Sequence, residues 1–446
     1  MASIYADRRA RLLERMEPGS VALFPTAPEA RRSNDTEYPF RADTDFFYLT
    51  GFDEPEALCV LAKGRPGVAF TMFVRPRDKE RETWTGRRAG PEGARTNFGA
   101  EEAFVWGDLD SKIGSLLEDA TAVYWNLGRY QEMDPRFTGW LNAIRSKQRA
   151  ALPPRKVLDP GPLVNELRMM KTTADLDILR KAVSISAEAH REAMTFTKPG
   201  VKEYEVQAVV EYVFRKSGSQ APGYNSIVGS GANATILHYV TNREVCKDGD
   251  LLLVDAGAEL DCFTGDITRT YPVNGTFSRL QRSLYDVVLE AQKRAIAACK
   301  PGATILSIHE ITVHALVEGM VKHKLLEGDV PFNIEKETYK KFYMHRTSHW
   351  LGMDVHDAGD YILPGKDAAA RQRKLEPGMV LTIEPGLYIS PDETLPADAD
   401  PALRGIGIRI EDDVLVTGAG NEILSFDCPK EAADIEKTMA RKTIFA

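Results

Sequence analysis

The sequence has few cysteines, and it lacks any Cys-x-x-Cys pair that would indicate a redox motif or a structural zinc site. The number of cysteines is odd and they stand far apart, which excludes the dense disulfide framework of small secreted domains. We therefore expect reduced thiols in a cytoplasmic protein at Cys59, Cys246, Cys262, Cys299 and Cys428.

Long apolar runs are also missing, since no segment approaches the ~18 apolar residues of a membrane span. The segment from Met1 to Arg15 has no continuous apolar core, so we expect an amphipathic helix there rather than a secretory signal or transit peptide. The net charge of −8 lacks the basic surplus of a nucleic-acid binder. We expect neither membranes nor nucleic acids as partners.

What the sequence does contain is an ordinary globular composition, with 446 residues of which 43% are hydrophobic and 27% charged. This length suffices for two or three domains with sizeable cores. Prolines at positions 153, 154, 160 and 162 end a first region of mixed strands and helices. We expect an N-terminal α/β domain at residues 1–165 and a C-terminal α+β domain at residues 171–446.

Apolar periodicity predicts the main elements of both domains. Spacings of three to four residues predict helices at 163–170, 174–196, 203–216, 279–299 and 304–324. Short apolar or alternating runs predict strands at 21–24, 58–62, 68–74, 251–255, 267–272, 380–384 and 407–411.

Four carboxylates and one histidine stand at the ends of apolar segments or within them, at Asp255, Asp266, His349, Glu384 and Glu411. Any single member could be a surface residue, because the chain has 65 acidic residues. As a set, however, the acids adjoin apolar residues, which are poor solvent-exposed settings. Burying four carboxylates together is costly unless cations compensate them. An oxygen-rich set with one imidazole suits one or two divalent ions, manganese first among them.

The spacing of these residues supports a shared site. Asp255 and Asp266 are 11 positions apart, so pairing of their strands would bring both carboxylates to the same end of a hairpin. Such ligands can hold two cations ~3.5–4 Å apart that bridge a water and lower its pKa toward neutrality. Arg409 stands two residues before Glu411 and would face the same side of a strand, where it could hold a ligand carboxylate. The alternative for Arg409 is a solvated strand residue.

The motifs around these residues resemble those of the pita-bread metallopeptidase family. They are Asp-Ala-Gly at 255–257, Gly-Asp-Ile-Thr-Arg-Thr at 265–270, Ser-His-Trp-Leu-Gly at 348–352, Glu-Pro-Gly at 384–386 and Gly-Ile-Arg-Ile-Glu-Asp at 407–412. The resemblance implies a pita-bread C-terminal domain and places the family's metal ligands on Asp255, Asp266, His349, Glu384 and Glu411. None of these ligands is missing, which argues against a relative that binds without hydrolysis.

Within the family the chain is most similar to the bacterial-type aminopeptidase P group. The similarity extends over residues 34–41, 45–52 and 75–88 in the first domain and over 224–239 and 344–357 in the second. It implies that the protein releases the N-terminal residue from peptides with proline at the second position, through a hydroxide that bridges two metal ions. Manganese is the expected metal, with zinc and cobalt as alternatives, and a homo-oligomer is expected, as a tetramer or dimer. The rival activity is that of a prolidase, which cleaves only Xaa-Pro dipeptides.

The resemblance also implies roles for the remaining polar residues. His238, His356 and Glu384 would be catalytic, with Glu384 accepting the proton of the water in addition to binding metal. His345 would line the pocket for the proline ring, and the other substrate-side candidates are Tyr224, Arg409 and Trp84. Trp84 would reach the active site of a neighbouring subunit. Structural packing is the alternative for each, and no role is predicted for the helical histidines His190, His309, His314 and His323.

Overall fold

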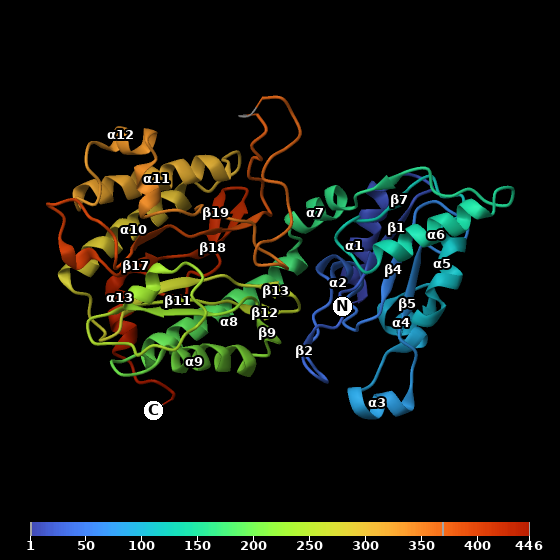
Figure 1. Cartoon of the computed structure of the whole chain (residues 1–446), viewed down its shortest axis with the longest axis horizontal. Helices are drawn as coiled ribbons and strands as arrows, with labels where there is room; N and C mark the ends of the chain where they lie inside the picture. The colour runs from blue at the N-terminus through green and yellow to red at the C-terminus, as the bar shows by residue number, and fades with distance from the viewer. Residues whose placement is uncertain (1, 368–369, 446) are drawn as a thin grey trace. The chain divides into compact units, whose positions relative to one another are not determined.

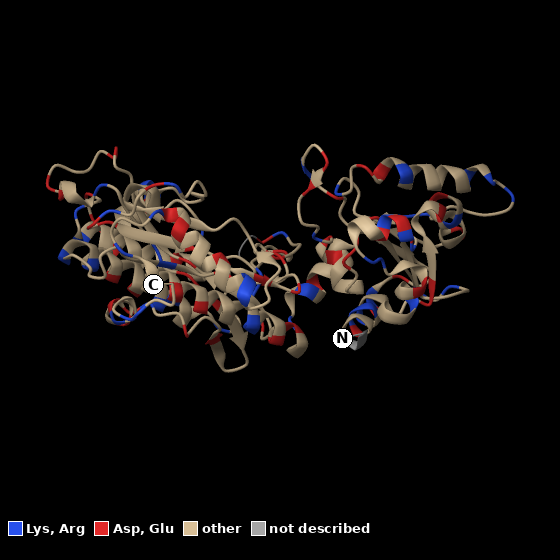
Figure 2. Ribbon diagram, turned by 90° about the horizontal axis from the view of Figure 1, so that it is seen from below, with Lys and Arg blue, Asp and Glu red and all other residues tan. Residues whose placement is uncertain are grey.

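The computed structural model describes residues 2–367 and 370–445, which form two compact units (Figure 1). The first unit ends at Leu167 and the second begins at Arg168. None of the described helices is long and apolar enough to cross a membrane. Positions of Lys and Arg are interspersed with those of Asp and Glu along the ribbons of both units (Figure 2).

The first unit is built on a six-stranded mixed sheet in the order β6-β5-β4-β1-β7-β8. The strands are β1 (Val21–Pro25), β4 (Leu58–Ala62), β5 (Phe70–Val74), β6 (Glu102–Val105), β7 (Val123–Tyr124) and β8 (Val157–Leu158). Its helices are α1 (Ala2–Arg15), α2 (Thr44–Thr50), α4 (Gly90–Phe98), α5 (Leu109–Leu117) and α6 (Asp134–Ser146). Alternate strand residues such as Val21, Leu23 and Val60 face one side of the sheet, where they pack in one core with α5 and α6.

Two small elements of the first unit are solvated. The hairpin of β2 (Arg31–Ser33) and β3 (Thr36–Glu37) has only exposed residues. Helix α3 (Lys79–Thr85), which Asp78 caps, buries none of its side chains. The segment around Trp84 is thus a short solvated helix, and Trp84 is 85% exposed.

The second unit has four long helices in two pairs among its described residues: α8 (Thr173–Phe196), α9 (Glu203–Lys216), α10 (Arg279–Ala298) and α11 (Ile305–Lys322). Side chains of Thr172, Ser278 and Thr304 cap three of them and fix where they begin. In Figure 1, α8 and α9 lie below β11 and β17, and α10 and α11 lie above them. One face of each helix contributes to the same apolar core.

Antiparallel strands form the layer between the helix pairs. One sheet has the order β10-β11-β14, from β10 (Ile227–Ser230), β11 (Leu251–Asp255) and β14 (Thr268–Pro272). A second has the order β15-β18-β19, from β15 (Val380–Ile383), β18 (Asp412–Thr417) and β19 (Gly420–Ile423). The pair β16 (Gly386–Ile389) and β17 (Ile406–Arg409) and the sheet of β9 (Ala221–Pro222), β12 (Ala258–Leu260) and β13 (Phe263–Thr264) complete the described strands. Helices grouped with antiparallel sheets confirm the α+β expectation.

The remaining helices are α7 (Gly161–Met169), α12 (Val330–Glu335) and α13 (Ala432–Met439), with 3-10 turns at 106–108, 231–235, 338–341 and 401–403. Most of the predicted helices and strands lie within one or two residues of those observed. The difference that matters for the site is in the last predicted strand, which ends at Arg409 rather than at Glu411. All five cysteines are buried thiols that form no disulfide.

Candidate metal centre

Two antiparallel strands position the aspartates. Asp255 is the last residue of β11, and Asp266 stands two residues before β14, which pairs with β11 so that Asp255 lies opposite Thr268. A Cβ on Gly257 would lie 1.7 Å from the carbonyl oxygen of Gly265. The backbones beside the two acids therefore approach too closely for a side chain at Gly257, whereas a Cβ on Gly265 would lie 2.8 Å from Ser186 Oγ on α8.

The glutamates come from the other side of the site. Glu384 directly follows β15, and its backbone N–H donates to the carbonyl oxygen of Thr347 over 2.8 Å. Glu411 lies between β17 and β18, where its N–H donates to the Thr268 carbonyl and the Thr268 hydroxyl donates to Glu411 Oε2 over 2.7 Å. Backbone pairing of Thr268 with Glu411 thus joins β14 to the segment between β17 and β18 at the site.

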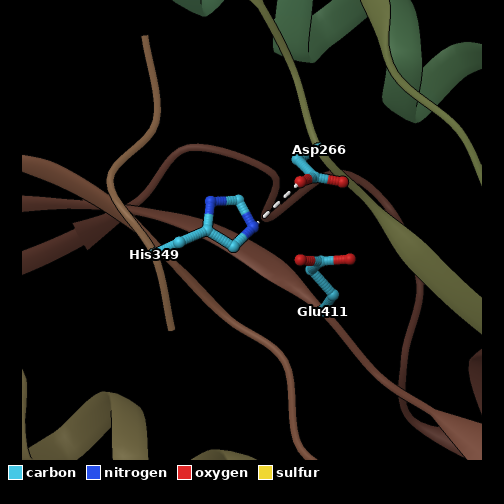
Figure 3. Close-up of side chains that lie close together, drawn as sticks. All are labelled: Asp266, His349 and Glu411. Carbon is cyan, nitrogen blue, oxygen red and sulfur yellow. Dashed lines mark ion pairs between the residues drawn. The ribbon is translucent and has the colours of Figure 1, made fainter. Parts of the chain in front are cut away.

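His349 lies in an extended segment beside these acids. Its Nδ1–H donates to the carbonyl oxygen of Trp350 over 3.0 Å, which leaves Nε2 pointing toward the carboxylates. Nε2 lies 3.4 Å from Asp266 Oδ2 and 3.6 Å from Glu384 Oε1. Ligand atoms of Asp266, His349 and Glu411 all lie within 4.8 Å of one another, and their side chains converge in Figure 3. This geometry could hold a metal ion.

The proton affinities reflect crowded negative charge. Burial, together with nearby Asp266 and Asp255, raises the pKa of Glu384 to about 7 despite His349 and Arg409. The same causes raise the pKa of Glu411 well above its usual range. Burial alone would lower the pKa of His349, but its pairing with Asp266 and the charge of Glu384 raise it to about 9. Bound protons thus offset the negative charge of these carboxylates, which a divalent cation would otherwise compensate.

Tyr224 gives a second indication that a cation fits this set. Its hydroxyl lies 2.6 Å from Asp255 Oδ1 and 2.6 Å from Asp266 Oδ1. A phenol has one hydrogen, so it can donate to only one of the two carboxylates at a time. The carboxylate oxygens therefore outnumber the available donors, and a divalent cation satisfies such a set.

The site opens into a cavity of about 970 Å³. The predicted site residues on its walls are Tyr224, His238, Asp255, Asp266, His345, His349, His356, Glu384, Arg409 and Glu411. The imidazole of His356 lies with its centroid 4.1 Å from that of His349. Trp84, the remaining predicted site residue, is on α3 of the first unit and is not one of the lining residues.

A hydrogen-bonded chain connects one wall to a predicted ligand. Arg409 donates through Nη2 to Asp255 Oδ2 over 2.6 Å and through Nη1 to the Tyr388 hydroxyl over 3.0 Å. The Tyr388 hydroxyl lies 2.8 Å from His345 Nε2, and His345 Nδ1 lies 2.7 Å from the Arg346 carbonyl oxygen. Burial and Arg409 lower the pKa of His345 to about 3, so its imidazole is neutral. Neutral His345 donates to Arg346 and accepts from Tyr388.

Comparison with known proteins places this site in a family. A model of metallopeptidase family M24 matches residues 177–418, and a model of the aminopeptidase P N-terminal domain matches residues 5–124. The chain belongs to metallopeptidase family M24. It is 44% identical to the Xaa-Pro aminopeptidase of Escherichia coli over 98% of both chains, and 35% identical to human Xaa-Pro aminopeptidase 3 over 92% of this chain and 79% of that one.

Solved structures agree with this family assignment. Aminopeptidase PepP of Pseudomonas aeruginosa is 47% identical, with a TM-score of 0.95 over 99% of this chain and 98% of that one. A variant of Escherichia coli aminopeptidase P in complex with substrate is 42% identical, with a TM-score of 0.93 over 98% of both chains. These findings confirm the pita-bread resemblance and its aminopeptidase P subgroup.

One cavity residue of this M24 metallopeptidase was not expected from the sequence. His309, on α11, lines the cavity, and its Nδ1 lies 2.9 Å from the Thr347 hydroxyl. That hydroxyl lies 2.8 Å from the buried Tyr343 hydroxyl. Tyr343, Thr347 and His309 thus form one hydrogen-bonded chain that ends at the cavity wall. The sequence could not show that His309 lines the cavity, because helical spacing gives only its helix and no motif surrounds the residue.

A buried ion-pair cluster holds Asp357, the residue that follows His356. Asp357 accepts from Lys171 Nζ over 2.9 Å and from Arg168 Nη2 over 2.7 Å, and all three side chains are almost fully buried. Burial would raise the pKa of Asp357, but Lys171 and Arg168 lower it below its usual value. The residue after His356 is thus tied to α7 and to the residue that precedes the cap of α8.

Proposed function

We propose that this M24 metallopeptidase is an Xaa-Pro aminopeptidase, which releases the N-terminal residue from peptides whose second residue is proline. The observation that carries the proposal is the convergence of four carboxylates and His349 on one cavity whose other walls include His238, His345 and His356. Its curated relatives of that name match almost the entire chain. An Xaa-Pro bond lacks an N–H and has a fixed φ, so a pocket for the ring is the specialised feature.

We propose that the site holds two divalent ions, with manganese favoured over zinc and cobalt. Asp255, Asp266, His349, Glu384 and Glu411 would hold them. Four oxygen donors with one imidazole form the intermediate set that manganese tolerates well. When bound, two such ions supply Lewis acidity, which polarises a carbonyl and brings the pKa of water toward neutrality.

The chain's own groups would move the proton and stabilise the developing charge. Glu384 is suited to accept the proton of the attacking water, because its carboxylate lines the cavity beside His349. His238 and His356 would donate to the oxygen on which negative charge develops. Burial and His349 lower the pKa of His356, so this imidazole is a neutral donor.

His345 and Tyr388 would form the wall against which the proline ring packs. Arg409 would hold Asp255 and Tyr388 in one arrangement, so that a predicted ligand and the pocket wall keep a fixed separation. Tyr224, whose hydroxyl contacts both Asp255 and Asp266, would keep these two carboxylates at a fixed separation.

Hydrolysis of matched peptides tests the activity. We expect the manganese-loaded protein to cleave a tripeptide Xaa-Pro-Xaa with release of the first residue, at least as fast as the dipeptide Xaa-Pro. The matched Xaa-Ala-Xaa peptide should be cleaved much more slowly, and mass spectrometry distinguishes the products. Turnover of the dipeptide without the tripeptide would make prolidase the better description.

We propose further that the protein is cytoplasmic and forms a homo-oligomer, either a tetramer or a dimer. The homo-oligomer is supported by Trp84, a large apolar side chain that is 85% exposed on a helix with no buried residues. Tryptophan is enriched at protein interfaces, where its large ring contributes apolar contact area. In this proposal Trp84 contacts peptide substrate in the active site of a neighbouring subunit, and the first unit restricts access to short chains.

A further inference from the structure

His238 has an unusual position among the residues of the cavity. It lies on the loop between β10 and β11, its side chain is exposed, and its imidazole makes no hydrogen bond with the described residues. Nothing on the ring itself therefore fixes where it points. Its position depends on how the backbone of residues 231–244 is held.

Glu203, the first residue of α9, holds this loop. The carboxylate is 0% exposed. Oε1 accepts from the Ser230 backbone N–H over 2.8 Å and from Asn233 Nδ2 over 2.9 Å. Oε2 accepts from the Tyr239 hydroxyl over 2.9 Å and from the Glu244 backbone N–H over 2.9 Å. One buried carboxylate thus binds the start of the loop, its end, and the residue next to His238.

The loop is also held from the opposite side. Arg409 Nη2 donates to the carbonyl oxygen of Leu237 over 3.4 Å, so His238 stands between two tethered neighbours, Leu237 and Tyr239. A Cβ on Gly407 would lie 2.1 Å from the Ala234 carbonyl oxygen, which shows how closely β17 packs against the loop. Together these contacts leave the loop little freedom to shift.

The donors on Glu203 are all neutral groups. A buried carboxylate without a cationic partner is costly unless its oxygens are fully hydrogen-bonded. Four donors and the N-terminus of α9 meet that requirement. An amide at this position would turn an NH₂ group toward the Tyr239 hydroxyl and the Glu244 N–H, so the four-point contact requires a carboxylate.

We propose that Glu203 is a positioning residue for the reaction, acting through His238 by fixing the loop that carries it. This inference rests on the proposed role of His238 as a donor to the developing negative charge. Glu203 does not line the cavity, so it acts on catalysis only through the loop.

The test is a double-mutant cycle on the manganese-loaded enzyme with an Xaa-Pro-Xaa tripeptide. Glu203→Gln should lower kcat by about 10- to 100-fold, the range expected when a catalytic group is misplaced by a fraction of an ångström or more. KM and metal content should stay within about twofold, because only a transition-state contact is weakened. In a His238→Ala background, Glu203→Gln should change kcat by less than about twofold.

Glu205→Gln is the matched control. Glu205 is exposed in the same first turn of α9, where it accepts from the Lys202 N–H, and no hydrogen bond joins it to the described residues of the loop. We expect its kcat to equal that of the unmodified enzyme. If Glu203→Gln does not fold, Tyr239→Phe removes one tether beside His238 and goes through the same cycle, with a smaller decrease in kcat expected.

The outcomes separate the two proposals. A normal kcat for His238→Ala would overturn the proposed role of His238 and this inference with it. A low kcat for His238→Ala, combined with an equal loss from Glu203→Gln in both backgrounds, would overturn only the positioning role. A folded, metal-loaded Glu203→Gln enzyme with unchanged kcat would do the same.

Discussion

His349 Nε2 lies 3.4 Å from Asp266 Oδ2, so an imidazole and a carboxylate meet where both side chains would bind a metal ion (Figure 3). This pairing helps raise the pKa of His349 to about 9, and the pKa of neighbouring Glu384 is raised to about 7. Both groups must lose their protons before they can act as ligands. Metal ions and protons therefore compete for this site.

The first prediction concerns that competition. Binding of Mn²⁺ to chelator-treated protein should release protons, and its affinity should rise by up to about tenfold per pH unit for each proton released. Isothermal titration calorimetry between pH 6 and 9, in buffers with different heats of ionisation, measures both quantities. An affinity that does not change with pH would show that the two groups are already deprotonated.

The second prediction concerns the stability of the metal-free protein. A carboxyl group whose folded pKa is raised binds its proton more tightly in the folded state, and so does a histidine with a raised pKa. Both contributions are present at low pH and are lost as pH rises, through about 7 for Glu384 and about 9 for His349. We expect the Tm of metal-free protein to fall by about 5 °C or more between pH 5 and 9. Saturating Mn²⁺ should remove this decline, and calorimetric scans with and without metal test both parts.

The third prediction separates catalytic groups from ligands. His238→Ala and His356→Ala should retain normal metal content, because neither residue belongs to the predicted ligand set. Each should lose about 10²–10³-fold in kcat, the effect of removing a donor to a developing oxyanion. Asp266→Ala is the contrasting variant, which should lose metal and activity together. A histidine variant with full metal content and normal kcat/KM would reassign that residue to a structural role.

The candidate metal ligands could be proposed from the sequence because their signal is local. A run such as Leu251 to Val254 predicts a buried strand from its apolar residues alone, and an acid at its end is then conspicuous. The same logic predicted that Arg409 faces the site. It did not identify the partner of Arg409, which is Asp255 on another strand rather than nearby Glu411. Side-chain direction follows from strand periodicity, whereas the partner depends on how the strands meet.

The supporting residues could not be predicted, because they are defined by contacts between distant segments. Glu203 looks like an ordinary acid in the first turn of a helix, and only the fold brings four loop donors to it. His309 stands on a helix without a surrounding motif, although it lines the cavity. Lys171 and Asp357 are 186 residues apart in the chain. No spacing rule in a single sequence reports such pairs.

The fourth prediction concerns the buried cluster at Asp357. Replacing Asp357 by Ala leaves Lys171 buried without this counter-charge and leaves Arg168 paired with Asp354, and breaking a buried pair typically costs about 3–5 kcal/mol. Glu422→Ala is the control, because its pair with Arg180 is exposed and is worth about 0–1 kcal/mol. Urea unfolding of both variants measures the difference in the free energy of unfolding.

The same cluster also predicts a pH dependence. The lowered pKa of Asp357 stabilises the fold above pH ~4, and this contribution is lost as the pH falls below that value. The Asp357→Ala variant should therefore lose less stability than the unmodified protein on acidification.

The last prediction concerns Trp84 and assembly. Light scattering of fully active enzyme should find a dimer or tetramer of the 49.5 kDa chain. Trp84→Ala should raise KM or lower kcat/KM for Xaa-Pro-Xaa peptides while metal content stays normal, because the indole would contact peptide rather than metal. Trp106→Phe in the first unit is a control for general loss of aromatic packing, since Trp106 packs beside the core of α5 and α6.

The proposed assembly also predicts that two inactive or impaired variants can complement each other when they are mixed. A Trp84→Ala subunit mixed with an inactive Asp266→Ala subunit should form hybrid oligomers in which one intact metal site receives one intact indole. Such hybrids should recover part of the activity, whereas an active monomer, or mixtures with no recovery, would place the action of Trp84 outside a neighbour's site.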